Sequence, residues 1–575
     1  MGNTHSKVSS WMRILLCASL ITVAHASVDF AKCFNETLSG VNGLDGLTDN
    51  RGNPVSNLSQ ATAMTYAACV ANCGGGSSEF SWSSFSQQLG IWLLPWVALF
   101  SQFPFGCRKR LDNLVSVVLA LGSPCLAAYS LALTALNTQW IGDRFDAIRY
   151  PNKQWAAVIL SSLQQMPLRL NPEGDLPSLV VLSDNDVWWE KLEDNLSYAD
   201  LHTWSIASAT SIAWVIAAYA LTVIDVFTTG YDPSNGLAGV GSVWLWMIPV
   251  SVGYLQLSPR CDAERVPKAL RDADHLIFVA SPAGTVSAHS VTEERAFSIE
   301  WDSQNRALYA DIEATAPIYN YARFLSFAHL VDEVASAFEA AAKKARQRIP
   351  VSGTEWEAGD GKNIHPKNRG GSPDEVERYC AQPVYVRRSH WGTQVLSRFL
   401  LASAAGLFLQ WGTAGGALTI SYFTPTVALG CRAASYMIYG SAATLVWIIL
   451  VMSSFLAHYA ISPTRDRIPR TTSQRVAEWL SIFLRRTGKI LATLNAAWII
   501  VFYMLNFASF FNSCWCEAAV IGLGRRRAHI DMVLSRAEIG NMNAAWAGGI
   551  IFAVTASGMY WGFLSVNRKP LRRLT

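Results

Sequence analysis

The chain has 575 residues, of which 51% are hydrophobic and 15% are charged, and its net charge is +4. Soluble domains are about one-quarter charged, so this composition excludes an ordinary soluble protein and indicates that much of the chain lies in lipid. The small net charge argues against a nucleic-acid partner. The eleven cysteines form no CxxC pair, which argues against a zinc finger.

Residues 1–26 carry two competing targeting patterns. Lys7 and Arg13 precede a short apolar stretch, Ile14–Val23, which ends at small residues around Ala26, as in a cleaved secretory signal peptide. The Met1-Gly2 start also fits N-myristoylation, which would leave this end in the cytosol. The apolar stretch is too short to span a bilayer, so the pattern favours the signal peptide.

Residues 27–88 form a polar segment that we expect in the lumen or outside the cell. Two glycosylation sequons and three cysteines support this location, because sugars are attached and disulfides persist there. With three cysteines, one must stay free or pair elsewhere. The residues concerned are Asn35, Asn57, Cys33, Cys69 and Cys73.

Eight apolar segments of membrane length follow, in a first membrane region (89–257) and a second (396–567). They predict an α-helical multi-pass membrane protein with seven or eight transmembrane helices. Prolines in the first two segments predict kinks. The segments are Leu89–Gly106, Leu114–Leu136, Trp204–Phe227, Leu237–Leu257, Phe399–Ser421, Tyr436–Tyr459, Ile490–Phe511 and Ala544–Val566.

Charged loops predict the orientation. Three basic stretches, 108–110, 465–489 and the tail 568–575, are typical of cytoplasmic sites. Loop 137–202 has ten acidic and five basic residues and a sequon at Asn195, and we expect it in the lumen. A lumenal N-terminus and a cytoplasmic tail require an odd number of crossings. We therefore expect seven, with the first or the fourth apolar segment not crossing.

Residues 258–395 are the longest polar stretch and predict a small soluble α+β domain, which its basic residues place in the cytoplasm. Alternation at Phe297, Ile299 and Trp301 predicts a strand. Helical spacing from Phe324 to Phe338 predicts an amphipathic helix, in which Glu339 and Lys343 are spaced for an i,i+4 pair. Polar, glycine-containing sequence over 353–373 predicts a flexible connector.

Three polar residues in the membrane regions are candidates for function, because charge inside a bilayer is costly. Asp225 either binds a cation or proton or marks a helix end at the headgroups. Gln410 and Arg432 flank a break at Thr424–Thr426, where a cavity could expose backbone groups and Arg432 could hold an anion or pair with a carboxylate. A tight loop with close helix packing is the alternative, and the small residues favour it.

The segment around this break resembles a motif of uncharacterised multi-pass membrane proteins of filamentous fungi. The matching residues are Gln410-Trp411-Gly412, Tyr422 to Val427 and Gly430-Cys431-Arg432, and the likeness extends to Cys514-Trp515-Cys516. That family has no agreed activity. The resemblance therefore implies a fungal setting and no catalytic residues.

Other patterns favour structural interpretations. Asp184 and Asp186 resemble the metal-binding Asp-x-Asp of glycosyltransferases, but an acidic turn fits a loop of this length better. Cys514 and Cys516, with His529, suggest soft metal ligation, although disulfides to the N-terminal cysteines are simpler. The chain has no GxxxxGK[ST], HExxH or GxSxG motif, and we predict no catalytic residue, metal or cofactor.

Two basic stretches remain. Val476 to Leu484 has an apolar face flanked by arginines, which fits either a helix lying on an anionic leaflet or a topological anchor. Arg525–Arg527 falls on the lumenal side of the expected topology, against the charge rule.

These patterns predict a non-enzymatic scaffold or accessory protein in a membrane of the secretory pathway or the plasma membrane. The alternative is a carrier or exporter of a small molecule, accessory to a fungal secondary-metabolite pathway. The expected partners are the lipid bilayer and either other membrane proteins or a small-molecule cargo.

Overall fold

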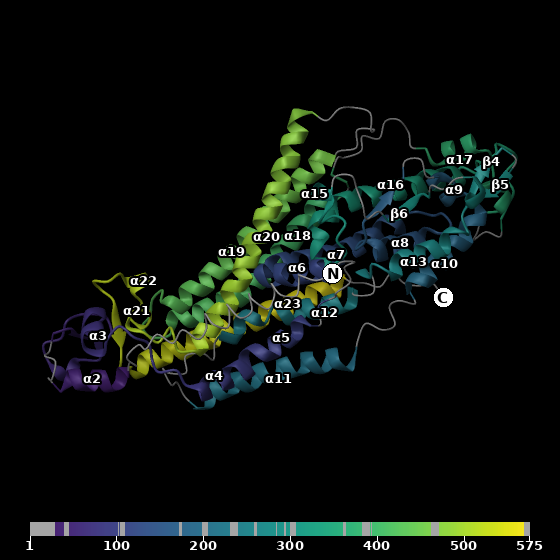
Figure 1. The fold of residues 1–575 in the computed structure, drawn as a ribbon. Coiled ribbons are helices and arrows are strands. Elements are labelled where there is room, and N and C mark those ends of the chain that lie inside the picture. The colour runs from purple at the N-terminus through teal and green to yellow at the C-terminus, as the bar shows by residue number, and fades with distance from the viewer. Residues whose placement is uncertain are drawn as a thin grey trace, which may run out of the picture.

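A computed structural model describes residues 29–39, 45–101, 103, 110–171, 175–197, 205–229, 240–257, 261–282, 284–291, 295–299, 306–359, 364–381, 391–392, 394–461 and 471–567. The molecule is elongated: a small cap lies at one end, a helix bundle in the middle and a distal domain at the other end (Figure 1). The targeting residues 1–26, the basic residues 108 and 109, and the tail 568–575 lie outside the described residues.

The cap joins residues 29–81 to residues 508–535. A three-stranded antiparallel sheet in the order β1-β2-β7 pairs Met64 with both Leu47 and Ile530, so the N-terminal segment and the connection before the last long helix form one unit. Its elements are α2 (Phe30–Leu38), β1 (Leu47–Thr48), β2 (Ala63–Thr65), α3 (Tyr66–Cys73), α21 (Cys514–Glu517), α22 (Val520–Leu523) and β7 (His529–Asp531).

Four long helices form the centre of the bundle: α18 (Val395–Phe423), α19 (Cys431–Ile461), α20 (Thr472–Phe507) and α23 (Arg536–Asn567). With α11 (Ile206–Thr229), they are the five helices among the described residues that are long and apolar enough to cross a membrane; a sixth is possible if a bent pair counts as one span. This count is below the seven or eight expected. At about 1.5 Å per residue, α18 alone is about 44 Å long, which exceeds the thickness of a bilayer core.

The bent pair is α6 (Arg110–Gly122) and α7 (Pro124–Asp146), whose axes differ by 108°. The second apolar segment was expected to be one kinked span. The break lies at Ser123, the N-cap of α7, whose hydroxyl accepts from the Leu126 amide and donates to the Ala443 carbonyl at the middle of α19. Proline at the first position of α7 suits a helix start, and here it begins a new helix.

The two apolar segments suspected of not crossing are both divided. Residues 82–100 are helical throughout, as α4 (Trp82–Gln88), a π-helical turn (Leu89–Leu93) and α5 (Leu94–Phe100). The fourth segment forms a 3₁₀ turn (Val240–Trp244) and the short helix α12 (Met247–Leu257). Both lie alongside the long helices (Figure 1).

The distal domain is built from two segments, 153–197 and 261–381. In it, β3 (Leu168–Leu170) pairs antiparallel with β6 (Phe297–Ile299), and β4 (Phe278–Ser281) with β5 (Gly284–Ser287). The helices are α8 (Lys153–Leu163), α9 (Leu176–Val181), α10 (Asp186–Ser197), α13 (Arg265–Asp274), α14 (Ala288–Val291), α15 (Arg306–Tyr309), α16 (Asn320–Arg346) and α17 (Pro373–Cys380).

The β3–β6 ladder corrects the expected topology. Loop 137–202 was predicted in the lumen and residues 258–395 in the cytoplasm, but strands that share hydrogen bonds lie on one side of a membrane. The Asn195 amide confirms the joint fold, because it donates to the Ala269 carbonyl at 3.4 Å. The predicted separation of the two loops is therefore wrong.

Other expectations for this domain have mixed outcomes. The strand at Phe297 and the helix from Phe324 to Phe338 are present as β6 and α16, while Trp301 lies outside the described residues. Glu339 pairs with Arg144 of α7 rather than with Lys343. The expected flexible connector is hydrogen-bonded where it is described, because Asn368 exchanges hydrogen bonds with the backbone of Glu357.

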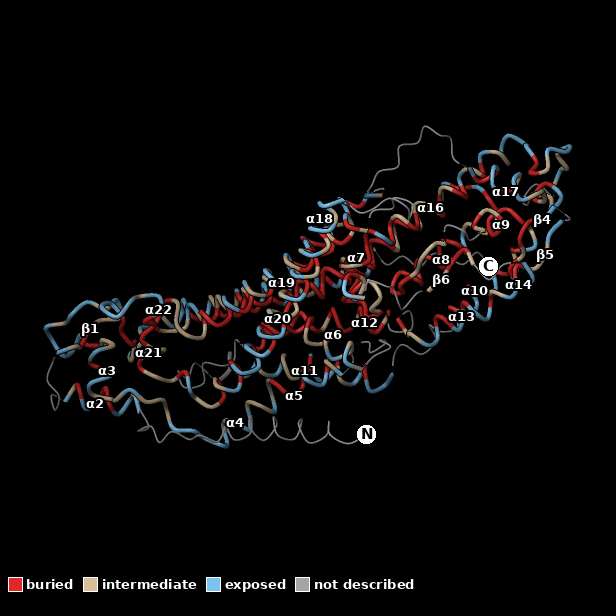
Figure 2. The backbone as a smooth tube through the Cα atoms, turned by 45° about the horizontal axis from the view of Figure 1, so that its top comes forward, coloured by how far each residue is buried: buried red, intermediate tan, exposed pale blue. Residues whose placement is uncertain are grey.

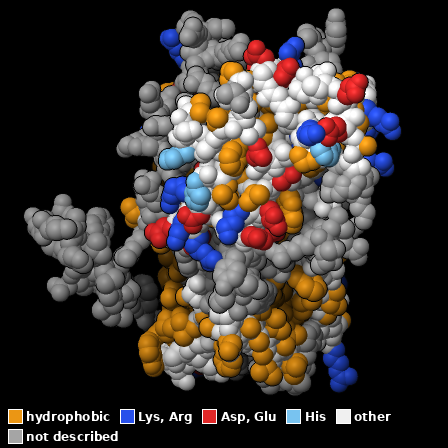
Figure 3. Space-filling view, turned by 90° about the vertical axis from the view of Figure 1, so that its right-hand side faces the viewer, with side chains coloured by type: hydrophobic (Ala, Val, Ile, Leu, Met, Phe, Trp, Pro, Cys, Tyr) orange, Lys and Arg blue, Asp and Glu red, His pale blue; other side chains and the backbone are white. Residues whose placement is uncertain are grey.

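One continuous apolar core runs from the bundle into the distal domain (Figure 2). Viewed from the distal end, charged side chains of both signs gather on the upper part of the face, and hydrophobic side chains predominate below (Figure 3). On the long helices, large apolar side chains such as Trp214, Leu221 and Ile551 are more than 60% exposed. Apolar surface of this extent is unfavourable in water and suits lipid.

Candidate functional site

Gln410 lies in the middle of α18 and is 1% exposed. Its amide nitrogen donates to the Gly440 carbonyl at 2.9 Å and to the Thr444 hydroxyl at 2.8 Å, both on α19. Its amide oxygen accepts from the backbone N–H of Cys125 at 3.1 Å. That N–H is one of the unpaired donors at the start of α7, so Gln410 caps the broken helix from outside. All of these bonds are internal links between α7, α18 and α19.

Small residues surround this link. A methyl group added to Gly416 of α18 would lie 2.6 Å from the Gly549 carbonyl of α23, and one added to Gly549 would lie 2.8 Å from the Gly416 carbonyl. The two backbones therefore touch, as in other close helix crossings that small residues permit. This geometry agrees with the packing interpretation of the segment that begins at Gln410.

Arg432 is the second residue of α19 and lies at the end of the bundle next to the cap. Its guanidinium donates to Asn506 at 3.0 Å, forms an ion pair with Glu517 at 3.1 Å and also donates to Asn512. The neighbouring residue, Cys431, is joined to Cys516. Of the two roles considered for Arg432, the structure therefore shows pairing with a carboxylate, that of Glu517, and this pair fastens α19 to the cap.

A hollow beside Arg432 is lined by Thr424, Pro425, Thr426 and Glu517, among others. The space open to water in it is ≈ 30 Å³, which holds about two water molecules. Asp225, the third candidate, lies on α11, but its side chain is outside the described residues. Gln410, in the middle of α18, and Arg432, at the cap end of α19, do not lie in one site.

The cap contains three disulfides: Cys33–Cys73, Cys69–Cys514 and Cys431–Cys516. Four of the five cysteines proposed from sequence are joined to each other, and Cys516 pairs with Cys431, which had been treated only as part of the Gly-Cys-Arg motif. Because Cys431 begins an apolar helix, its own surroundings in sequence gave no sign of pairing. The other described cysteines form no disulfide and lie in the bundle and the distal domain; they are Cys125, Cys261 and Cys380.

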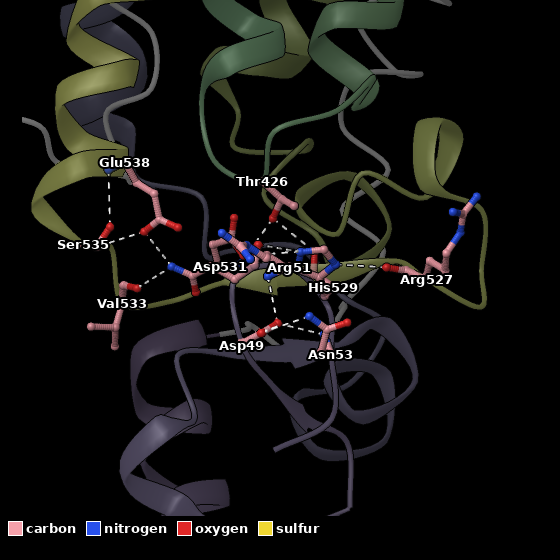
Figure 4. A network of polar contacts seen from close by, with 11 residues as sticks. Asp49, Arg51, Asn53, Thr426, Arg527, His529, Asp531, Val533, Ser535 and Glu538 are labelled. Atoms are coloured by element: carbon pink, nitrogen blue, oxygen red, sulfur yellow. Dashed lines mark hydrogen bonds and ion pairs between the residues drawn. The ribbon is translucent and has the colours of Figure 1, made fainter. Parts of the chain in front are cut away.

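A polar network joins three separate parts of the chain within the cap (Figure 4). The ring nitrogens of His529 lie 2.9 Å from the Arg527 carbonyl and 3.3 Å from the Asn50 carbonyl, and Nε2 is 3.5 Å from the Asp531 carboxylate. The Thr426 hydroxyl donates to the His529 carbonyl and accepts from the Asp531 amide. The Thr-Pro-Thr break is therefore a docking point for β7.

Asp531 is the most unusual carboxylate of this network. Its side chain is 7% exposed, and one of its oxygens has no hydrogen-bond donor among the described residues. Burial raises the pKa of Asp531 to about 7, with further raising by Glu538 and Asp49, while His529 opposes the shift. Hydrogen bonds from Asn53 lower the pKa of Asp49. Burial therefore brings the pKa of the Asp531 carboxyl group close to neutrality.

A shallow groove of ≈ 400 Å³ lies beside this network, between the Asp49–Arg51 turn and Glu538 at the start of α23. Glu538 accepts from the Asn50 amide at 2.8 Å and caps α23 through the Ser535 amide. The polar walls of the groove can hydrogen-bond a ligand. Within the described part of the chain, no group of three His, Cys, Asp or Glu side chains is placed to hold a metal ion.

Sequence reasoning missed a second ionic cluster, at the junction of the bundle and the distal domain. Asp311 is 1% exposed as a side chain and pairs with Lys489 and, at 3.9 Å, with Arg485, both on α20. Tyr321 donates to the same carboxylate. The i,i+4 spacing of Arg485 and Lys489 was visible, but the loop that supplies their partner was not. This cluster fastens segment 306–319 to α20.

Two further expectations are resolved by the same packing. Asp186 forms an ion pair with Arg369 at 2.7 Å, and Asn185 is buried among backbone groups of Ser178 and Phe278, so the Asp-x-Asp segment is a structural turn. The apolar run before it forms the helix α9. Val476 to Leu484 belongs to the uninterrupted helix α20, which excludes a separate helix lying in the membrane plane.

Comparison with known proteins finds no matching family model, curated protein or solved structure.

Proposed function

We propose that the chain is an integral membrane scaffold that holds a disulfide-braced cap outside the cytoplasm and a folded domain inside it. The main observation is that Gln410 and Arg432, the polar residues expected to contact a cargo, form hydrogen bonds to other residues of the protein instead. In addition, two loops that are separate in sequence combine into one domain outside the bundle. Such a molecule has a folded surface at each end to present to a partner.

Seven crossings fit this arrangement. Phe85 contacts Phe507 at the cap end of α20, and Phe103 contacts Tyr254, so residues 82–103 run away from the cap. Trp244 contacts Tyr503, which gives residues 240–257 the same direction. With α6 and α7 as a pair that enters and leaves on the distal side, these two segments and the five long helices make seven crossings. An odd number is required, because the described chain begins in the cap and ends with α23, which runs away from it.

Cysteine and charge patterns support the orientation. The six paired cysteines lie at the cap end, whereas Cys261 and Cys380 of the distal domain form no disulfide. Disulfides persist outside the cytosol and thiols within it. Arg485 and Lys489, in the described part of the basic stretch 465–489, pair with Asp311 at the junction with the distal domain, which agrees with the charge rule for a cytoplasmic side. Asn35 and Asn57 would then be glycosylated, and Asn195 would not.

The carrier alternative is less well supported. It needs a polar cavity near the Thr-Pro-Thr break, and the hollow there has room for water rather than for a metabolite. The residues that would line a path at the centre of the bundle form direct interhelical bonds instead.

Cross-linking of the full chain in intact cells, followed by mass spectrometry, tests the scaffold. We expect cross-links from another protein to lysines of the distal domain, such as Lys191 and Lys268, and we expect the cells to release the same solutes with wild-type protein and with Arg432→Lys. The matched control is Arg348→Lys, an exposed position of the distal domain. Absence of such cross-links, together with solute release that fails only in Arg432→Lys, would favour the carrier.

A further inference from the structure

Three consecutive arginines form an exposed turn between α22 and β7. The turn is closed by hydrogen bonds from the Arg527 and Ala528 amides to the Gly524 carbonyl, at 3.1 and 3.0 Å. Arg525, Arg526 and Arg527 are all exposed, and within the described part of the chain none of their guanidinium groups has a carboxylate partner. Three unpaired positive charges therefore lie together on a turn of defined shape.

The turn is rigidly placed. The segment before it is tied to α3 by Cys69–Cys514 and to the first residue of α19 by Cys431–Cys516. Gly522 packs so closely on Leu429 that an added methyl group would lie 2.7 Å from the Leu429 amide. The arginines are consequently fixed near the level at which α19 begins.

Apolar side chains on the same segment show what this surface faces. Phe510, Trp515 and Ile521 are exposed just beyond the last residue of α20. Arg525 lies over the Trp515 ring, 5.4 Å from its centroid. In Figure 4 the Arg527 side chain points away from the N-terminal segment, toward the side from which the long helices enter. Exposed aromatic residues next to arginines are typical of the headgroup region of a bilayer.

We propose that Arg525, Arg526 and Arg527 bind the phosphate groups of phospholipids in the leaflet on the cap side, with Trp515 inserted at the interface. This inference rests on the proposed membrane setting. The charge rule predicts few arginines on the non-cytoplasmic side of a membrane. Binding of lipid phosphates gives these three arginines a role other than setting the orientation of the chain in the membrane. An acidic protein partner fits less well, since it would leave the apolar side chains beside the turn uncovered.

The test compares full-length protein in nanodiscs of phosphatidylcholine with and without phosphatidylglycerol. Native mass spectrometry measures the phospholipids retained, and a thermal scan measures apparent Tm. We expect wild-type protein to retain phosphatidylglycerol preferentially and to gain Tm from it. R525Q/R526Q/R527Q should lose that preference, by about fivefold per arginine removed. The control is K343Q/R346Q/R348Q, which removes the same charge from exposed positions of the distal domain.

Equal lipid retention and Tm gain in the turn variant and the control would overturn the proposal. Protection of wild-type protein by inorganic phosphate or a soluble acidic peptide, at a level matching phosphatidylglycerol, would also overturn it in favour of a soluble anion. Failure of the protein to enter nanodiscs at all would instead refute the membrane setting on which the proposal depends.

Discussion

The side chain of Gln410 accepts a hydrogen bond from the backbone amide of Cys125, 3.1 Å away and 285 residues earlier in the chain. This contact satisfies a helix terminus that is buried at the centre of the bundle, where water is unavailable to do so. It lets the chain reverse inside the bundle at Ser123 without leaving that donor unpaired.

Replacing Gln410 with leucine should therefore destabilise the bundle. The change leaves the buried Cys125 amide without its hydrogen-bond acceptor, at a cost of about 1–3 kcal/mol, while the Gly440 carbonyl keeps its hydrogen bond from the Thr444 hydroxyl. Size-exclusion chromatography after heating in detergent should show a lower apparent Tm. Gln347→Leu, an exposed position after α16, is the control and should leave Tm nearly unchanged. A Q410L protein as stable as wild type would contradict the capping role.

Adjacent glycines provide a matched test of the α18–α23 contact. Gly416→Ala places a methyl group against the Gly549 backbone and should cost about 1–3 kcal/mol. Gly415→Ala meets no atom within 4 Å and should stabilise the helix by up to about 1 kcal/mol. Thermal scans of both variants should move in opposite directions. Equal shifts would mean that the two helices do not touch at Gly416.

Glycosylation reports the sidedness of the two ends. Asn35 and Asn57 belong to the cap and are exposed, whereas Asn195 belongs to the distal domain. We expect Asn35→Gln and Asn57→Gln each to increase electrophoretic mobility by one glycan, and endoglycosidase to remove the difference. Asn195→Gln should migrate as wild type. A mobility shift in Asn195→Gln alone would reverse the proposed orientation.

Asp531 should make cap stability depend on pH. Its folded-state pKa of about 7 lies above the ordinary aspartate value, so the folded cap binds a proton more tightly than the unfolded chain. The stabilisation from this group is complete below about pH 4 and is lost as pH rises to about 7. Asp49, whose pKa is lowered by hydrogen bonds from Asn53, acts in the opposite direction. The difference between wild type and Asp531→Asn isolates the effect.

Hydrogen exchange of residues 47–65 from pH 4 to pH 8 provides that comparison. Protection in wild-type protein should fall relative to Asp531→Asn as pH rises. Parallel profiles in the two proteins would show that Asp531 titrates as it does in the unfolded chain.

The Arg369–Asp186 pair should matter more than the neighbouring Lys367–Glu357 pair. The Arg369 side chain is 4% exposed and also donates to the buried Val181 carbonyl, so Arg369→Met removes a buried donor and should cost about 1–3 kcal/mol. Lys367 is largely exposed, and Lys367→Met should cost less than about 1 kcal/mol. Pulse proteolysis of the distal domain measures both. Similar losses would contradict the assignment of Arg369 as the internal link.

Local properties of the sequence were sufficient for much of the fold. Runs of apolar residues predicted the long helices α11, α18, α19, α20 and α23, because the hydropathy of a membrane-length helix depends on its own residues. Periodicity in the same way predicted β6 and α16. The small residues after Gln410 indicated close helix packing, and the backbones of Gly416 and Gly549 are in contact.

Only the tertiary structure decided the relationships between distant segments. The acidic charge of loop 137–202 suggested the lumen, but backbone hydrogen bonds between β3 and β6 join it to residues 261–381, and loop charge carries no information about such a pairing. The partner of Cys516 and the carboxylate of Asp311 were invisible for the same reason. Whether the helix continues past Ser123 or turns back depends on the hydrogen bond that Gln410 accepts from the Cys125 amide. Because Gln410 belongs to another helix, this bond exists only once the bundle has formed.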